Sequence, residues 1–200
     1  YDLAVDGYEW LYAPGSSAGM IPTNDGQTGV FVGTAPAQMK AARRAGSAQD
    51  AVSTLLATVS PAAAERVSAA RAPQHLRGFA GMPGYLRRSW GPGWALVGDA
   101  GYFEDPLSTH GITDALRDAE LLADAVGEIH NGTATEATAL AGYQRARDAF
   151  ADRLFGTVET IASFTWTVPQ IRRLLLEASS AMSEQVEALQ SFDQHDQAKA

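Results

Sequence analysis

Near the beginning of the chain, short hydrophobic segments alternate with short polar ones. Over residues 8–35, short aromatic or apolar runs are separated by Gly, Pro and Asx turns. The pattern predicts three short strands, at 8–12, 19–24 and 29–33, joined as an antiparallel meander. The following residues, 37–71, are rich in alanine and helical in composition.

The second half of the chain carries longer periodic segments. The apolar run 94–97 is typical of a buried strand in a parallel sheet. Beyond it, apolar residues recur with helical spacing, which predicts an amphipathic helix with one buried face. These residues are Ile112, Ala115, Leu116, Ala119, Leu122, Ala123 and Val126. Two further helices are expected, over about 138–155 and 169–189.

The composition of the chain argues against several classes of function. The 200 residues are 46% hydrophobic and 19% charged, which is ordinary for a globular domain. A formal net charge of -8 argues against binding to nucleic acid or to anionic lipid. No apolar run is long enough to span a membrane. The absence of cysteine excludes disulfides and thiolate sites and agrees with a cytoplasmic location, which we expect.

Candidate chemistry is concentrated between residues 91 and 116. Asp99 follows the predicted strand, where its carboxylate could accept hydrogen bonds from sugar hydroxyls, and Gly98 allows close approach of a ligand. Gly111 precedes a helix whose first N–H groups are unpaired and whose dipole is positive at that end. This order predicts a site for a ligand with negative charge, such as the pyrimidine edge of a reduced flavin.

The same segment also contains residue types found in other kinds of site. Ser108, His110 and either Asp105 or Asp99 supply the residue types of a hydrolase triad, but no Gly-x-Ser-x-Gly elbow is present. His110 either lies near a ligand or is an exposed loop histidine, and the sequence favours neither. The four histidines lack metal-ligand spacing, so no metal site is predicted.

The same segment resembles a known flavoprotein family. The motifs are Gly98-Asp99-Ala100, Asp105-Pro106, Gly111, Asp114-Ala115 and the run 118–122. They are similar to the second FAD fingerprint of flavoprotein monooxygenases with the p-hydroxybenzoate hydroxylase-like fold, to which geranylgeranyl reductase-like oxidoreductases and flavin halogenases are related. The β-rich residues 8–35 also resemble the substrate-domain sheet of that family.

The resemblance implies a role for each matching residue. Asp99 would bind the ribityl chain, with Gly98 giving access, and Pro106 would lie near the isoalloxazine ring. Gly111 and Ile112 would offer backbone N–H groups to the pyrimidine edge. It implies FAD as cofactor, NAD(P)H as reductant and a small organic substrate. No side chain is an obvious acid or base, so the sequence names no catalytic residue.

The other half of an FAD site is missing. No Gly-x-Gly-x-x-Gly unit for the ADP half follows a strand anywhere in the chain. We therefore expect the C-terminal half of such an enzyme, with the missing N-terminal half in the same polypeptide and a homodimer as a possible assembly. The expected fold is α/β, or α+β within this fragment: part of an FAD/NAD(P)-binding Rossmann-like domain, an antiparallel substrate-domain sheet and C-terminal helices.

The expected domains follow from these patterns. Residues 1–72 would belong to a substrate-binding domain, 73–130 to the C-terminal part of the FAD domain, and 131–200 to C-terminal helices. The predicted function is an FAD-dependent oxidoreductase, most simply a monooxygenase that uses NAD(P)H and O2 on a small organic substrate. A flavin-dependent reductase or halogenase is the alternative within the class. A non-enzymatic fragment that binds a partner is the alternative outside it.

Overall fold

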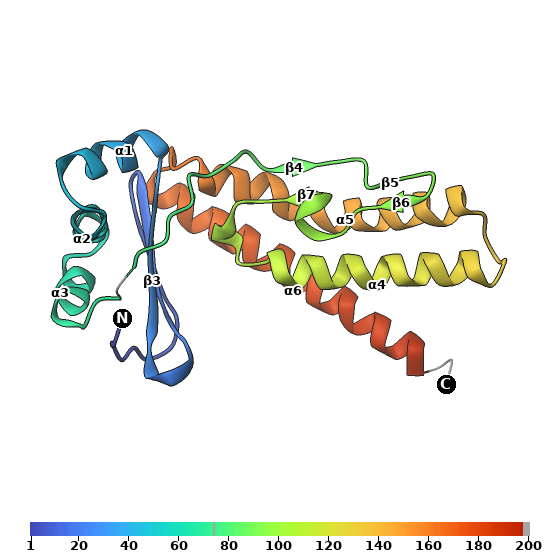
Figure 1. Cartoon of the computed structure of the whole chain (residues 1–200), viewed down its shortest axis with the longest axis horizontal. Helices are drawn as coiled ribbons and strands as arrows, with labels where there is room; N and C mark the ends of the chain where they lie inside the picture. The colour runs from blue at the N-terminus through green and yellow to red at the C-terminus, as the bar shows by residue number, and fades with distance from the viewer. Residues whose placement is uncertain (74, 198–200) are drawn as a thin grey trace. The chain divides into compact units, whose positions relative to one another are not determined.

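The computed structural model describes residues 1–73 and 75–197, and its helices and strands form an α+β protein (Figure 1). The α+β class, the antiparallel sheet and the C-terminal helices are therefore confirmed. The chain divides into two compact units. One comprises 1–81 and 163–172, and the other comprises 82–162 with the remainder of the last helix.

The first unit is built on a three-stranded antiparallel meander. β1 (Glu9–Ala13), β2 (Ser16–Pro22) and β3 (Thr28–Thr34) pair in chain order, with Leu11 opposite Ala18 and Ala18 opposite Val32. The prediction of a meander over 8–35 is thus confirmed. Gly15 has a φ of 79° in the turn between β1 and β2, a conformation that glycine adopts at little cost.

Three helices cover one face of this sheet (Figure 1). They are α1 (Pro36–Ala45), α2 (Ala48–Val59) and α3 (Pro61–Ala69). Ala18 and Met20 of β2 pack with Leu56 of α2, and all three side chains are almost completely buried. The opposite face is aromatic, because the Phe31 ring covers Gly19 and meets Trp10 edge to face at 5.4 Å. A side chain at position 19 would collide with that ring, which explains the glycine.

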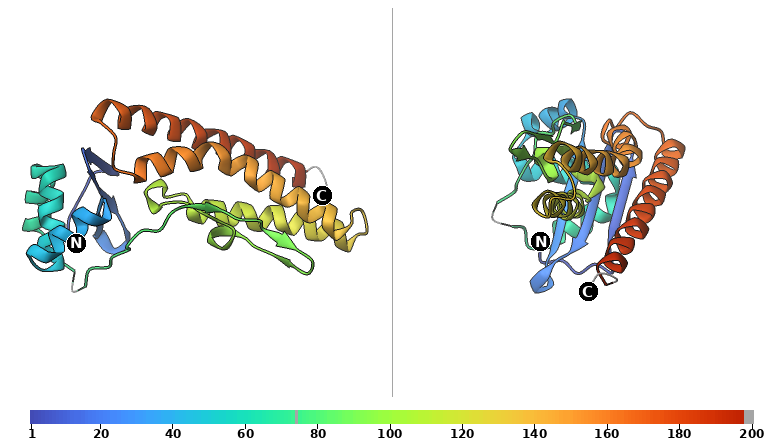
Figure 2. Two further views of the ribbon diagram at one scale, coloured as in Figure 1. Left: turned by 90° about the horizontal axis from the view of Figure 1, so that it is seen from above. Right: turned by 90° about the vertical axis from the view of Figure 1, so that its right-hand side faces the viewer.

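The second unit contains two small antiparallel ladders and three long helices. β4 (Tyr85–Leu86) pairs with β7 (Tyr102–Phe103), and β5 (Trp90–Gly91) pairs with β6 (Trp94–Ala95). The helices are α4 (Gly111–His130), α5 (Glu136–Ala162) and α6 (Val168–Gln197). Two views show α5 beside α6, and a hydrogen bond from Gln185 to the Phe150 carbonyl joins the pair (Figure 2).

The prediction that residues 94–97 form a buried strand of a parallel sheet is wrong. β6 ends at Ala95 and folds back on β5 through a turn at Gly93, which has a φ of 75°. Val97 is 37% exposed rather than buried. Every ladder in the described residues is antiparallel, so the Rossmann-like part of the expected fold stays a prediction. A run of four apolar residues predicts a strand, but it does not show whether that strand pairs with a distant segment in a parallel sheet or with the adjacent segment in a hairpin.

The helix boundaries also differ from their sequence patterns. α4 passes through Gly127 and ends at His130, where Asn131 and Gly132 form the turn to α5. α5 passes through Gly156 and continues to Ala162, seven residues beyond the predicted end at Phe155. A glycine inside a helix costs about 1 kcal/mol relative to alanine, which the packing of long neighbouring helices offsets.

Candidate functional site

The candidate site lies where the chain passes from β6 into α4. A short 3-10 turn, η2 (Gly98–Ala100), follows the β5–β6 hairpin, and β7 then leads to a second one, η3 (Pro106–Ser108). The Tyr85 hydroxyl donates to the Asp99 carbonyl oxygen at 2.6 Å, which fixes η2 against β4. The five site residues predicted from the sequence all belong to this connection or to the first turn of α4.

Gly98 is the point at which the connection touches α4. Its φ is 53°, and its N–H donates to Asp118 Oδ2 at 3.1 Å. A Cβ atom at position 98 would lie 2.8 Å from the Cβ of Ala115. The absence of a side chain is therefore required by the contact with the helix, whether or not a ligand is bound.

Replacing Gly98 with alanine is expected to destabilise the protein by about 2–4 kcal/mol, since left-handed strain and overpacking each contribute. Chemical denaturation followed by circular dichroism measures the loss. Gly132→Ala is the matched control, because Gly132 also has a positive φ, of 69°, but has no atom within 4 Å of the added Cβ. Equal losses in the two variants would show that the contact with Ala115 does not constrain the fold.

Asp99 and Gly111 lie beside each other although they are twelve positions apart in the sequence. The Oδ1 atom of Asp99 is 3.7 Å from the place that a Cβ of Gly111 would occupy. Both residues are exposed. The structure thus places an accessible carboxylate next to the start of α4.

The first turn of α4 has no side-chain cap. His110 is the N-cap residue and makes no capping hydrogen bond through its side chain. The N–H groups of Gly111, Ile112 and Thr113 precede the first helical hydrogen bond, which runs from Asp114 N to the His110 carbonyl. Uncapped N–H groups at a helix start suit a ligand that carries negative charge.

Pro106 and Ile112 are exposed on either side of the turn into this helix. Pro106 begins η3, where Asp105 Oδ1 accepts a hydrogen bond from Leu107 N at 3.0 Å. Thr109 then takes a left-handed conformation, with a φ of 57°, and directs the chain into α4. Ile112 is 80% exposed. An accessible carboxylate, uncapped N–H groups and an apolar rim thus lie together at the start of α4.

A buried ionic cluster underlies the exposed site, and sequence reasoning missed it. Arg117 donates to Asp114 Oδ1 at 2.7 Å and to Asp118 Oδ1 at 2.8 Å, and all three side chains are almost fully buried. Nearby, the Tyr102 hydroxyl donates to Glu104 Oε2 at 2.6 Å within the core. The i, i+3, i+4 spacing of Asp114, Arg117 and Asp118 was the available signal, because such positions share one helix face.

Burial dominates the electrostatics of this cluster. It raises the pKa of Glu104, although hydrogen bonds from Ser108 and Tyr102 act in the opposite direction. Burial also raises the pKa of Asp114, against the attraction of Arg117. The phenol of Tyr102 has a raised pKa, again chiefly because it is buried and secondly because Glu104 lies beside it.

Five of the seven apolar residues predicted to be buried on α4 are turned outward, whereas Ala115 and Leu122 are partly buried. Ile112, Leu116 and Val126 are 80%, 69% and 53% exposed, and the alanines at 119 and 123 are exposed as well. The buried residues of the helix are instead Asp114, Arg117, Asp118 and Ala125. Periodicity located an amphipathic helix but could not show which face meets the rest of this chain. We call the residues Ile112, Leu116, Ala119, Ala123 and Val126 the α4 stripe.

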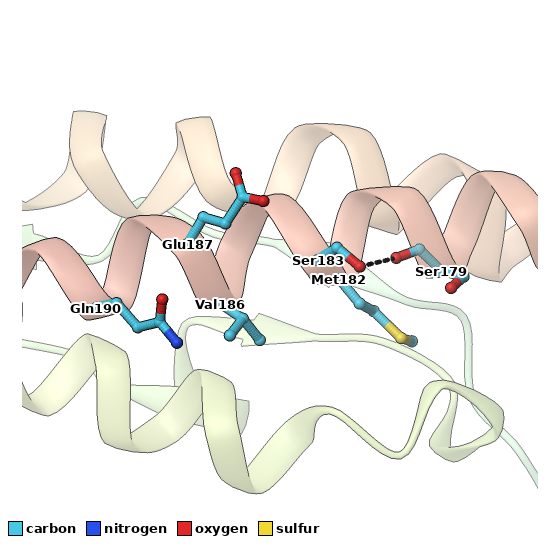
Figure 3. A pocket seen from close by; sticks show the side chains of 6 residues that line it. All are labelled: Ser179, Met182, Ser183, Val186, Glu187 and Gln190. Carbon is cyan, nitrogen blue, oxygen red and sulfur yellow. Dashed lines mark hydrogen bonds between the residues drawn. The ribbon is translucent and has the colours of Figure 1, made fainter.

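Two hollows in the second unit lie away from Asp99 and Gly111. One is lined entirely by side chains of α6, namely Ser179, Met182, Ser183, Val186, Glu187 and Gln190 (Figure 3). A single helix face offers no opposing wall, so this hollow lacks the enclosure typical of a cofactor pocket. The other lies between α5 and α6 at Phe150 and Gln185.

The structure supports neither a hydrolase triad nor a metal site in the residues that it describes. Ser108 Oγ accepts from the backbone N of His110 at 3.2 Å, and Asp105 caps η3, so neither contact is that of a triad. Within residues 1–73 and 75–197, no group of three or more His, Asp or Glu side chains is arranged to hold a metal ion. No helix in the same residues is long and apolar enough to cross a membrane.

Comparison with solved structures finds the fold of this chain in another protein. It is similar to P. aeruginosa PqsL, whose structure was determined in complex with 2-aminobenzoylacetate, with a TM-score of 0.53 and 23% sequence identity. The match covers 78% of this chain and 44% of the PqsL chain. No protein-family model matches the sequence, and the curated proteins contain no match.

These findings correct the family assignment. The motifs at Gly98-Asp99-Ala100 and Asp105-Pro106 led to the C-terminal half of a p-hydroxybenzoate hydroxylase-like enzyme. No family model supports that membership, and 23% identity to PqsL shows a shared fold alone. Short motifs of Gly, Asp and Pro recur in many turns, so they carry less information than a match along the whole chain. The chain spans 44% of the length of PqsL.

Proposed function

We propose that the chain is part of a flavin-dependent oxidoreductase and that the connection 98–112 binds the flavin end of FAD. One observation carries this proposal: the exposed Asp99 carboxylate lies beside the uncapped first turn of α4 at Gly111. The fold shared with PqsL supports the proposal at the level of architecture.

Each residue of the connection has a role in the proposed site. Asp99 would accept hydrogen bonds from ribityl hydroxyls, while the N–H groups of Gly111 and Ile112 would donate to the pyrimidine edge. Pro106 would lie near the ring. Bound flavin supplies electron transfer and, in a monooxygenase, the activation of O2. The chain itself supplies position and a positive helix end.

The proposed site is completed by a further folded part of the same protein. The α4 stripe leaves apolar residues exposed next to Gly111, and the match with PqsL leaves more than half of that chain unaccounted for. Together these observations support a covering part that packs on the stripe and supplies the contacts to the ADP half of FAD. On the same basis we propose that residues 1–72 belong to a substrate-binding domain, 73–130 to the C-terminal part of the FAD domain, and 131–200 to C-terminal helices.

Within the oxidoreductases, we propose a monooxygenase that acts on a small organic substrate with NAD(P)H as reductant. The aromatic face of the first unit, formed by Trp10, Phe31, Tyr12 and Trp166, offers a surface suited to such a substrate. Oxygen uptake that depends on both NAD(P)H and substrate tests this choice. Reduction without oxygen transfer would favour the reductase, and incorporation of halide would favour the halogenase.

Asp99→Ala is expected to weaken flavin retention by the complete protein about 10- to 100-fold, which corresponds to the loss of charge-assisted hydrogen bonds worth about 1.5–3 kcal/mol. Flavin absorbance after dialysis measures the loss. Asp124→Ala is the matched control, because Asp124 is an exposed carboxylate on α4 outside the first turn. A colourless complete protein that FAD cannot reconstitute would contradict the flavin proposal.

A second candidate is a partner-binding module without enzymatic activity, and the α4 stripe is the observation that favours it. The two candidates differ in what covers the stripe and in whether flavin is retained. A colourless protein whose stripe is protected by a partner chain would support the module. A yellow protein whose stripe is protected within one polypeptide would support the oxidoreductase.

A further inference from the structure

The Asp99 carboxylate takes its direction from the backbone of η2. Its side chain is exposed and makes no hydrogen bond or ion pair with any group in residues 1–73 and 75–197. Its Oδ1 atom approaches Gly111, at 3.7 Å from the place of an added Cβ. The orientation of this acceptor therefore depends on what holds the Asp99 main chain.

Three successive carbonyl groups of this turn accept hydrogen bonds from Tyr85 of β4 and from Arg87, which follows β4. The Tyr85 hydroxyl donates to the Asp99 carbonyl oxygen at 2.6 Å. The Arg87 guanidinium donates to the Ala100 carbonyl oxygen at 3.4 Å, and the Arg87 backbone N–H donates to that of Gly101 at 2.8 Å. The bond from Tyr85 is the shortest of the three, and it is the one made to the residue that carries the carboxylate.

The Tyr85 ring is held in place on two sides. Phe103, its partner in the β4–β7 ladder, packs against it with ring centroids 5.6 Å apart. The Arg87 guanidinium carbon lies 3.9 Å from the ring centre, which is a cation–π contact. The Arg87 carbonyl accepts a hydrogen bond at 2.7 Å from Arg147, which is fully buried. The Tyr85 hydroxyl thus reaches η2 from a fixed ring, so its position is set before any ligand binds.

The helix α4 holds the same turn at its first residue. The Gly98 N–H donates to Asp118 Oδ2 at 3.1 Å, and Asp118 is fully buried. Within the turn, the Gly101 N–H donates to the Gly98 carbonyl oxygen at 2.9 Å. Asp99 lies between these attachments. Loss of the Tyr85 hydrogen bond would leave the Asp99 main chain held through its neighbours alone.

We propose that Tyr85 is a positioning residue of the flavin site: by holding the Asp99 carbonyl group, its hydroxyl directs the Asp99 carboxylate toward the ribityl chain. An acceptor held in the productive direction binds more tightly than one that samples several directions, because its ordering precedes binding. Tyr85 acts through Asp99 and not by touching the flavin. The inference rests on the proposed function, since it requires that Asp99 binds a flavin.

A double-mutant cycle in the complete protein tests whether Tyr85 acts through Asp99. Tyr85→Phe keeps the ring, and with it the contacts to Phe103 and Arg87, and removes only the hydroxyl. It is expected to weaken FAD binding about 2- to 10-fold, the effect of one hydrogen bond between uncharged groups. In an Asp99→Ala background the same substitution is expected to have no further effect. Additive losses would overturn the proposal.

Two smaller flavins separate positioning from support of the fold. Riboflavin carries the ribityl chain, whereas lumiflavin has a methyl group in its place and offers Asp99 no hydroxyls. Tyr85→Phe is therefore expected to weaken the binding of riboflavin, measured by quenching of flavin fluorescence, and to leave that of lumiflavin unchanged. A purely structural effect would reach the helix start at Gly111 and weaken both, so equal losses would contradict the positioning role.

Tyr143→Phe is the matched control for the lost hydroxyl. The Tyr143 hydroxyl also donates to a backbone carbonyl of the same unit, that of Leu96 at 2.5 Å, but outside the connection 98–112. Its loss is expected to lower stability in urea, because Tyr143 is 3% exposed, and to leave FAD binding unchanged. Equal losses of FAD affinity in Tyr85→Phe and Tyr143→Phe would overturn the assignment of Tyr85.

Hydrogen exchange in the flavin-free complete protein examines the structural step without any ligand. Exchange of the Gly101 amide, whose hydrogen bond closes η2, is expected to be about 2- to 10-fold faster in Tyr85→Phe. An unchanged rate would show that Tyr85 does not hold the turn and would overturn the proposal, even in a protein that binds FAD. If the rate increases but neither FAD nor riboflavin binds, the proposed function fails and the positioning role fails with it, while the attachment of η2 to β4 stands.

Discussion

Replacing Arg117 with alanine is expected to destabilise the protein by about 3–5 kcal/mol, the largest loss of any single change considered. The guanidinium is 1% exposed and satisfies two buried carboxylates, Asp114 and Asp118. Removing it leaves both anions in the core without a positive partner. The free energy of unfolding from urea titration measures the effect.

The control for this substitution is Arg153→Ala. Arg153 pairs with Glu184 on the surface, where the two side chains are 61% and 50% exposed. Exposed pairs contribute about 0–1 kcal/mol because water and salt screen them. Comparable losses for Arg117→Ala and Arg153→Ala would mean that the buried cluster is not what secures α4.

Replacing Leu116 with glutamate is expected to leave the folding of the 200-residue chain intact and to weaken flavin binding in the complete protein. In the 200-residue chain the change should alter stability by less than about 0.5 kcal/mol, since Leu116 is 69% exposed. In the complete protein the same charge would be buried against the covering part. A penalty of about 3 kcal/mol or more would lower flavin retention over 100-fold.

Leu176→Glu provides the matched comparison. Leu176 is 74% exposed on α6, outside the α4 stripe, and its replacement should leave flavin retention unchanged. Flavin absorbance and urea titration are measured on both variants. If Leu116→Glu retained flavin as well as Leu176→Glu does, the α4 stripe would not be the surface on which the site is completed.

The β-rich beginning of the chain was predictable because its determinants are local. Turn residues such as Gly15 and the alternation around Met20 specify a hairpin without help from distant segments. The proximity of Asp99 to Gly111 depends on how the connection between them folds, so the sequence did not predict it. The helix that follows was located correctly by its period.

The direction in which that helix faces could not be predicted from its period. Ile112 and Leu116 appeared to be core residues because hydrophobic periodicity does not indicate what covers a face. Asp114 and Asp118 appeared to be solvent-exposed because charged residues are rarely buried, and their pairing with Arg117 depends on tertiary packing. The prediction of a parallel strand at 94–97 was wrong because the sequence pattern did not show that the turn at Gly93 folds β6 back on β5.

The hydrogen bond from Gly98 N to Asp118 Oδ2 links the local stability of η2 to that of α4. It joins residues twenty positions apart, so η2 depends on a helix that is synthesised after it. Local turns form quickly, but contacts of this separation wait for chain closure and for the docking of their partner. The turn η2 is therefore expected to reach its native form together with α4. Exchange of the Gly98 amide with solvent reports openings of that helix rather than fraying of the loop.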